Sequence, residues 1–113
     1  MEQGRNERSI TRALKARADG LEPRFDATAR TFYVPSRSGS GEHAVTLRFR
    51  RSRLIVACDC RRPGSMIEAG VTACWHGAAV CLEVAAMDLI GFEQGEWVLH
   101  ESGRSVVNAV LVA

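Results

Sequence analysis

The chain has 113 residues, of which 46% are hydrophobic and 25% charged, and its formal net charge is +2. This length and ordinary apolar content predict a single domain over residues 1–113. The longest strongly apolar stretch, 77–87, is interrupted by Glu83 and is shorter than the ~20 residues of a membrane-spanning helix. Residues 1–6 are polar and precede no apolar signal segment, so we expect a cytoplasmic protein, in which structural disulfides are rare.

The first predicted element is a helix that ends at about Ala18. Asn6 or Ser9 is expected to cap its N-terminus, because their side-chain oxygens accept hydrogen bonds from the first turn. Gly20 is expected to end it.

A short strand is predicted at 31–34, where four β-prone residues (TFYV) precede Pro35. The preceding segment, 21–29, is expected to be irregular because Pro23 breaks any continuation of the helix. The following segment, 36–42, has the glycine and serine content of a flexible hairpin loop.

Two strands with period-2 alternation follow, over 44–50 and 53–60, and a tight hairpin at 51–52 joins them. In the first strand, apolar side chains alternate with polar ones. In the second, the alternation places Cys58 and Cys60 on the same side. The end of this strand therefore projects two sulfurs in one direction, where both can bind one ion.

The second half of the chain predicts a loop, a buried helix and a second hairpin. Residues 61–73 have the turn residues of a loop, and 74–88 is apolar nearly all round, which is typical of a buried helix. The second hairpin pairs 96–100 with 105–112 around 102–103. The predicted class is α+β: a small antiparallel sheet with a strand–strand–helix unit, an N-terminal helix and a C-terminal hairpin.

Three of the four cysteines and one histidine form the pattern Cys-x-Cys followed by Cys-x-His. They are Cys58, Cys60, Cys74 and His76. Three thiolates and one imidazole complete a tetrahedral shell, which is the coordination of structural Zn²⁺ and leaves no position for a reactive water. We therefore predict a zinc site that stabilises the fold, since a small domain gains much of its stability from such a site.

Two alternatives to zinc remain open. The cysteines can be incidentally buried, or Cys58 and Cys60 can form a redox pair whose thiol pKa is lowered by the arginines that follow. Cys81 lies about 10 Å along the helix from Cys74 by rise per residue, too far to bind the same ion, and is predicted to lie in the core. His43 and His100 are predicted to be ordinary polar residues.

The cysteine and histidine pattern, with its strands and helix, resembles the SWIM-type zinc finger over roughly 32–86. The resemblance implies that the four residues bind Zn²⁺. It also implies contact with nucleic acid, because the family is associated with DNA-handling proteins. Two features depart from the family: Arg61 and Arg62 follow the second cysteine where a proline is frequent, and Trp75 occupies a position where a basic residue is frequent.

Two classes of cysteine–histidine enzyme do not fit the sequence. Zinc deaminases need His-x-Glu with Pro-Cys-x-x-Cys, and neither motif is present. A Cys–His hydrolase needs a base held against an activated thiolate, and zinc binding accounts better for Cys74 and His76. We therefore expect a binding protein and no catalysis.

Basic residues are concentrated in the first half of the chain. Residues 1–62 carry 14 basic and seven acidic side chains, whereas 63–113 carry one basic and six acidic. Such an asymmetry suits a polyanionic partner, although a solvated surface explains it equally well. Trp75 or Tyr33 can stack on an unpaired base if exposed, but core packing is the simpler prediction for both. The candidate nucleic-acid-binding residues are Arg48, Arg50, Arg51, Arg53, Arg61 and Arg62.

A protein–protein interaction adaptor is the alternative function. In that case the zinc only fixes the fold, and the apolar segment 105–113 pairs as a strand with a protein partner or a second copy. The same strand can instead complete the protein's own sheet. Salt separates the two functions, because phosphate binding weakens steeply as salt rises.

Overall fold

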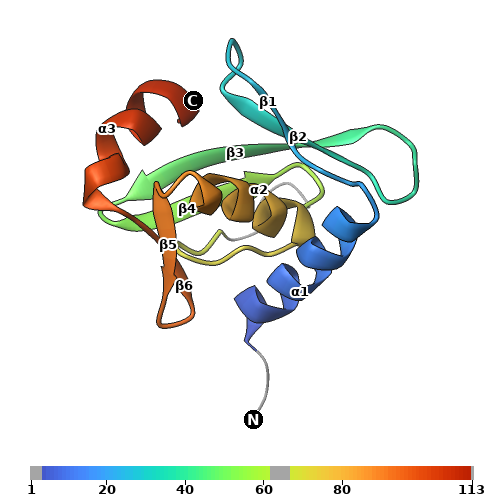
Figure 1. The fold of residues 1–113 in the computed structure, drawn as a ribbon, viewed down its shortest axis with the longest axis horizontal. Coiled ribbons are helices and arrows are strands. Elements are labelled where there is room, and N and C mark those ends of the chain that lie inside the picture. The colour runs from blue at the N-terminus through green and yellow to red at the C-terminus, as the bar shows by residue number, and fades with distance from the viewer. Residues whose placement is uncertain (1–3, 62–66, 113) are drawn as a thin grey trace.

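The structure is a computed structural model that describes residues 4–61 and 67–112. These residues form three α-helices and a six-stranded antiparallel sheet with the strand order β1-β2-β3-β4-β6-β5 (Figure 1). The predicted α+β class is confirmed. The helices are α1 (Arg5–Ala18), α2 (Trp75–Ala86) and α3 (Arg104–Val106). The strands are β1 (Arg24–Asp26), β2 (Thr31–Pro35), β3 (Glu42–Arg50), β4 (Arg53–Cys58), β5 (Ile90–Glu93) and β6 (Glu96–Leu99).

The predicted strand–strand–helix unit is present as β3, β4 and α2. β3 and β4 form a hairpin whose register runs from Arg50 opposite Arg53 to Val45 opposite Cys58. Arg51, in the turn, has a φ of 58°, the left-handed conformation that a tight reversal requires. The strand β1 lies in the segment predicted to be irregular, and it pairs with β2 at the edge of the sheet.

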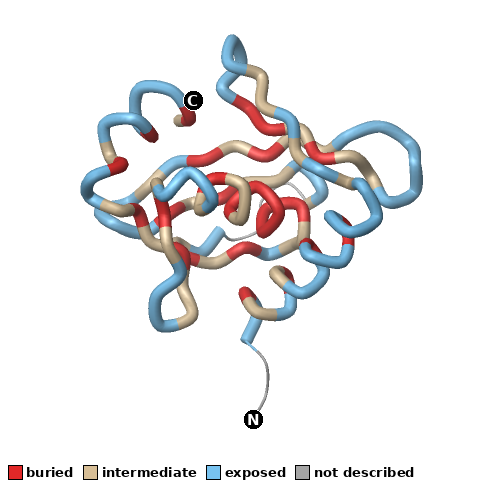
Figure 2. Tube along the Cα trace, viewed as in Figure 1, coloured by how far each residue is buried: buried red, intermediate tan, exposed pale blue. Residues whose placement is uncertain are grey.

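The core lies on one face of the sheet. The alternate side chains of β3 and β4 that point to this face are buried or, near the strand ends, half-buried, and α2 packs against them. Figure 2 shows buried residues concentrated in α2 and in the strands behind it. We call the opposite side the outer face of the sheet; apart from the buried Thr31 in β2, its side chains are half-buried or exposed. They include Tyr33, Thr46, Arg48, Ile55 and Val98.

α1 packs against α2 through small side chains, with Ala13 and Ala78 in one buried cluster. The predicted helix is confirmed, but its predicted cap is wrong. Gly4 is the N-cap, and Asn6 and Ser9 lie inside the helix, buried against the loop that precedes α2. Their side chains make tertiary hydrogen bonds to that loop and so are not available for capping.

The predicted strand at 105–112 is wrong, because 105–111 is helical and Val112 alone forms a β-bridge, to Leu47. α3 continues into a π-helical turn at Val107–Leu111. The two ends of that turn are four residues apart and both are buried against the core, while Val106 is exposed. This spacing is that of one helical face, and it outweighs the β propensity of the valines.

The C-terminal hairpin consists of β5 and β6, so the strand predicted at 96–100 pairs with Ile90–Glu93. Its turn is at Gln94 and Gly95, both with positive φ. Within the described ranges, none of the helices combines the length and apolarity that a bilayer crossing needs.

Candidate metal centre

The four predicted ligands come together in the structure, although 13 residues separate Cys60 from Cys74 in the sequence. One ligand atom from each of Cys58, Cys60, Cys74 and His76 lies within 4.8 Å of the others. The end of β4 supplies the first pair and the start of α2 the second. This cluster can hold a metal ion.

The end of β4 and the following turn position the first two thiols. Cys58 is the last residue of the strand and lies on the core side. Cys60 was predicted to lie in the strand, but the strand ends at Cys58. Cys60 lies instead in a turn closed by a hydrogen bond from the Arg61 amide to the Cys58 carbonyl at 3.3 Å. The Asp59 amide also donates to the Ala44 carbonyl at 3.1 Å, so the backbone at the turn is anchored to β3.

The first turn of α2 positions the other two ligands. Cys74 is the N-cap residue, with extended backbone, and His76 is buried in the first turn at 8% exposure. The N-terminal end of a helix carries partial positive charge, which favours a thiolate there. The helix therefore supports Cys74 in the ionised form that a metal requires.

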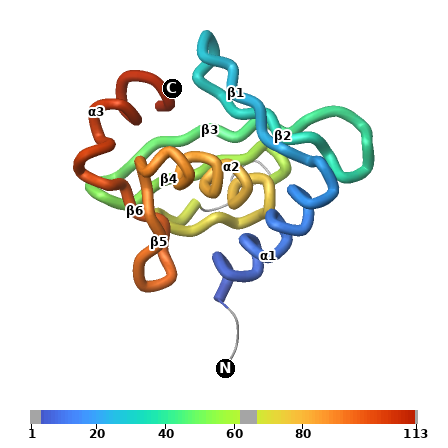
Figure 3. The backbone as a smooth tube through the Cα atoms, viewed as in Figure 1, coloured from blue at the N-terminus to red at the C-terminus, as the bar shows by residue number. Residues whose placement is uncertain are grey.

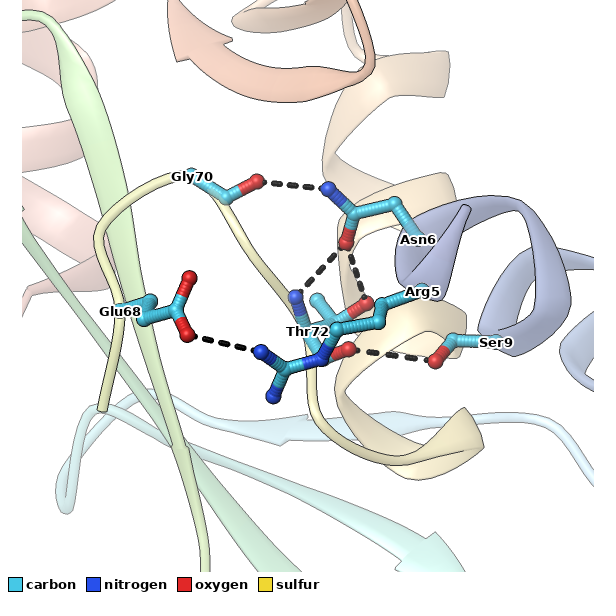
Figure 4. A network of polar contacts seen from close by, with 6 residues as sticks. All are labelled: Arg5, Asn6, Ser9, Glu68, Gly70 and Thr72. Atoms are coloured by element: carbon cyan, nitrogen blue, oxygen red, sulfur yellow. Dashed lines mark hydrogen bonds and ion pairs between the residues drawn. The ribbon is translucent and has the colours of Figure 1, made fainter. Parts of the chain in front are cut away.

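A polar network fixes the segment that leads into Cys74 (Figure 4). The Asn6 side-chain oxygen accepts hydrogen bonds from the backbone amide and the hydroxyl of Thr72, at 2.8 and 3.0 Å. The Ser9 hydroxyl donates to the Thr72 carbonyl at 3.2 Å, and the Asn6 amide group donates to the Gly70 carbonyl at 2.8 Å. α1 thereby holds the backbone two residues before a ligand.

The spacing of the cluster fits a tetrahedral ion. With metal–sulfur bonds of about 2.3 Å, the sulfurs of a tetrahedral site lie about 3.8 Å apart. With a metal–nitrogen bond of about 2.0–2.1 Å, a sulfur and an imidazole nitrogen of the same site lie about 3.5 Å apart, and the Cys58 sulfur and the His76 Nδ1 are 3.8 Å apart. All four donors lie within 4.8 Å, so only small side-chain adjustments bring them to bonding distance.

The pKa shifts of the three thiols show how closely they are placed. The Cys58 thiol donates a hydrogen bond to Cys74, which lowers the pKa of Cys74 and raises that of Cys58. Burial also raises the pKa of Cys60. Without a cation, one thiolate forms readily and the next is opposed by burial and like charge. A divalent ion removes this opposition and stabilises all three thiolates.

His43 and Asp59 lie beside the cluster, a position that was not predicted for either residue. The His43 ring packs on the His76 ring with centroids 4.2 Å apart, and its Nδ1 is 2.9 Å from the Asp59 carboxylate. His43 is not among the clustered ligands. The period-2 pattern of β3 carries the signal, because continuing it back from Val45 places His43 on the face that Cys58 occupies.

The other two predictions for cysteine and histidine residues concern Cys81 and His100. Cys81 is fully buried in the core, as predicted, and burial raises the pKa of its thiol. His100 follows β6, where its Nδ1 lies 3.2 Å from the Asp88 carbonyl. Neither residue belongs to the cluster.

Four of the predicted nucleic-acid-binding arginines lie at one end of the β3–β4 hairpin. Arg48 and Arg50 are exposed and alternate with the buried Leu47 and the half-buried Phe49, so they point to the outer face of the sheet. Arg51 is in the turn, and Arg53 is opposite Arg50. This end of the hairpin is remote from Cys58, so these arginines are not beside the metal centre. Their contact with nucleic acid stays a prediction.

The remaining candidates for nucleic-acid contact lie elsewhere. Arg61 is half-buried directly after Cys60, and Arg62 lies outside the described residues. Tyr33 is half-buried on the outer face, with the Arg24 guanidinium 4.5 Å from its ring centre. Trp75 is half-buried, packing partly against the core.

Comparisons with protein-family models, with curated proteins and with solved structures found no match for this chain. The resemblance to the SWIM-type zinc finger therefore rests on the four clustered residues and on their place at a strand end and a helix start.

Proposed function

We propose that the protein is a zinc-stabilised, non-enzymatic module that binds nucleic acid. The observation that carries the zinc assignment is the cluster of three cysteines and one histidine within 4.8 Å. Soft thiolates with one imidazole in a tetrahedral arrangement favour Zn²⁺. Four protein ligands leave no position for a substrate or a reactive water, so the ion supports the fold and carries out no reaction.

The nucleic-acid assignment is supported by exposed and unpaired positive charge. Arg48, Arg50 and Arg51 are exposed, and within the described ranges none of them forms an ion pair. Arginines in this state can neutralise phosphates without first breaking an ion pair. Arg53, by contrast, is paired with Glu96 at 3.0 Å, so it contributes less.

The alternative function, a protein–protein interaction adaptor, loses the feature on which it depended. Residues 105–111 are helical and Val112 forms a β-bridge with Leu47 of the same chain, so this backbone is not available to pair as an apolar strand with a partner. Nucleic acid is the better supported partner, and the experiments below separate the two.

Native mass spectrometry of the full chain, purified without added metal or tag, tests the zinc site. We expect one zinc per chain in the wild type and none in Cys60→Ser. Cys81→Ala is the matched control, because this cysteine is buried outside the cluster, and it should keep its zinc. A folded wild-type chain without metal would contradict the zinc assignment.

Fluorescence anisotropy with a labelled oligonucleotide tests the partner. We expect the affinity to fall steeply between about 50 and 200 mM salt, and Arg50→Ala with Arg51→Ala to reduce the salt slope. Arg17→Ala with Arg24→Ala is the control of equal charge, because both of these arginines are already paired with glutamates. Absence of binding, or binding that ignores salt, would favour the adaptor.

A further inference from the structure

A basic groove of about 360 Å³ lies next to the metal centre, at the start of α2. Its lining residues are Arg12, Lys15, Arg37 and Trp75. We propose that this groove, here named the Trp75 groove, binds an unpaired nucleotide of a single-stranded nucleic acid. The base stacks on the Trp75 indole, and the adjoining phosphates lie between Arg12 and Lys15. This inference rests on the proposed function and adds that the bound strand has an unpaired base.

The aromatic wall of the groove is fixed by the metal centre. Trp75 is the first residue of α2 and lies between Cys74 and His76 in the sequence. Its ring is 4.1 Å from the His76 ring, centre to centre, and other parts of the side chain pack against the core. One face of a π system held in this way is suited to stacking on a base, because little side-chain freedom is lost on binding.

The cationic wall comes from two separate segments. Arg12 and Lys15 are three residues apart on α1, so they share a face of that helix, and both are exposed. Within the described ranges neither forms an ion pair. Both charges are therefore available to phosphate oxygens.

Arg37 closes the groove from the loop between β2 and β3. Figure 3 shows this loop on the same side of the molecule as the C-terminal end of α1. An ion pair between Arg37 and Asp19, at 3.0 Å, joins the two segments. The Arg37 guanidinium carbon is 5.9 Å from the centre of the Trp75 ring, so an aromatic face and positive charge are presented together.

The combination of wall types identifies the ligand. Three cations against one carboxylate give the groove a positive balance that attracts an anion, and a volume of about 360 Å³ lies in the range of small-ligand sites. A free phosphate has no planar group that could stack on the indole, and most residues of an acidic peptide have none either. A nucleotide supplies both parts. A base inside a duplex has both faces covered by its neighbours, so the strand must be single.

Tryptophan fluorescence of the zinc-loaded full chain reports directly on this groove. The protein has two tryptophans, and Trp97 is 2% exposed in the core, so it provides a constant background. Titration with a short oligo(dT) strand should quench Trp75 emission, whereas a blunt duplex of the same length should leave it nearly unchanged. Trp75→Phe should abolish the quenching while leaving the zinc content at one per chain.

Two double variants of equal charge locate the contact by anisotropy. Arg12→Ala with Lys15→Ala should weaken the single strand about tenfold and leave the duplex nearly unaffected, because two phosphate contacts are lost in the groove. Arg48→Ala with Arg50→Ala, on the outer face of the sheet, should weaken both ligands to the same extent. Zinc content and circular dichroism of each variant establish that it is folded.

The possible failures are distinct. The first failure has three signs: single strand and duplex bind equally, Trp75 emission is not quenched, and only the Arg48 and Arg50 double variant loses affinity. This result would overturn the groove assignment and leave the proposed function standing. If neither nucleic acid binds, the proposed function is overturned as well. If poly-glutamate quenches Trp75 as strongly as oligo(dT), the groove recognises acidic chains and base stacking is overturned.

Discussion

The two ends of α2 are stabilised by different interactions. Near its C-terminal end, Val84 belongs to a cluster of large apolar side chains that includes Leu54, Ile90 and Trp97. At its N-terminal end, the buried residues of the helix other than the predicted ligand His76 are small. They are Gly77, Ala78 and Ala79, beside the three thiols and the imidazole of the metal centre.

The small residues at the N-terminal end allow close approach but bury little apolar surface. A Cβ added at Gly77 would lie 3.0 Å from a Val56 methyl group, so no larger residue fits there without a shift. Each buried CH₂ contributes about 0.8 kcal/mol, and an alanine contributes much less than a leucine. We therefore expect this end of α2 to depend on a bound metal ion for stability that the opposite end obtains from burial.

Removal of the metal should have the largest effect and should be felt first at the N-terminal end of α2. Metal binding in small zinc domains contributes about 10–16 kcal/mol in apparent binding free energy, and it is coupled to folding. Addition of a chelator, or Cys60→Ser, should lower the Tm strongly. In hydrogen exchange, the Ala78 amide, which donates to the Cys74 carbonyl, and the amides that follow it in α2 should lose protection before those of β6. Unchanged circular dichroism and Tm would contradict this coupling.

Alkylation with iodoacetamide provides an internal control for the same experiment. With metal bound, all four cysteines should be protected. With chelator, Cys58, Cys60 and Cys74 should react, whereas Cys81 should stay unmodified until the core unfolds, because it is fully buried and its pKa is raised. Simultaneous reaction of all four would indicate that the two ends of α2 do not differ.

The second prediction concerns the apolar end. Leu54→Ala should lower the free energy of unfolding by about 2–5 kcal/mol, because it opens a cavity in the core. The variant should keep its zinc, since Leu54 lies at the opposite end of β4 from Cys58. Chemical denaturation of the zinc-loaded protein measures the change.

Ile55→Ala is the matched control for Leu54→Ala. Ile55 is the next residue of the same strand but lies half-buried on the outer face, so its truncation should cost clearly less. If both variants lost the same free energy of unfolding, the outer face would be packed as tightly as the core. This would contradict a sheet with its core on one face only.

Features encoded over a few neighbouring residues were predictable. The alternation of apolar and polar residues predicted the strands β3 and β4 and the hairpin between them. The apolar composition of 74–88 predicted the buried helix. The Cys-x-Cys and Cys-x-His spacing predicted the four residues that the structure brings together in a cluster able to hold a metal ion. In each case the local pattern and the tertiary environment favour the same conformation.

Features that depend on distant segments were not predictable. The valines of 105–112 favour a strand locally. A helix forms instead, because it lets Val107 and Leu111, four residues apart, both pack in the core. Asn6 was predicted to cap the helix because of its residue type. The prediction failed because its hydrogen-bond partners lie 64 and 89 residues away in the sequence. The Trp75 groove likewise joins α1, the loop after β2 and the start of α2, which no sequence spacing relates.

The smallest of the three predicted effects concerns Asn6, which is 2% exposed. Its amide group donates to the carbonyls of Gly70 and Gly95 at 2.8 and 2.7 Å, and its oxygen accepts from Thr72. Asn6→Ala leaves these buried groups without partners and should lower the free energy of unfolding by about 1–3 kcal/mol. Thermal and chemical denaturation of the zinc-loaded protein measure the loss.

Arg5→Ala is the control for Asn6→Ala, since it removes another contact between α1 and the same loop. Arg5 pairs with Glu68 at 2.7 Å, but both side chains are about half exposed, so the change should be within about 1 kcal/mol. Asn6→Ala should also speed the release of zinc to a chelator, because the network fixes the backbone before Cys74. Equal release rates in the two variants would mean that the buried network supports α1 alone and that the metal end of α2 is positioned without it.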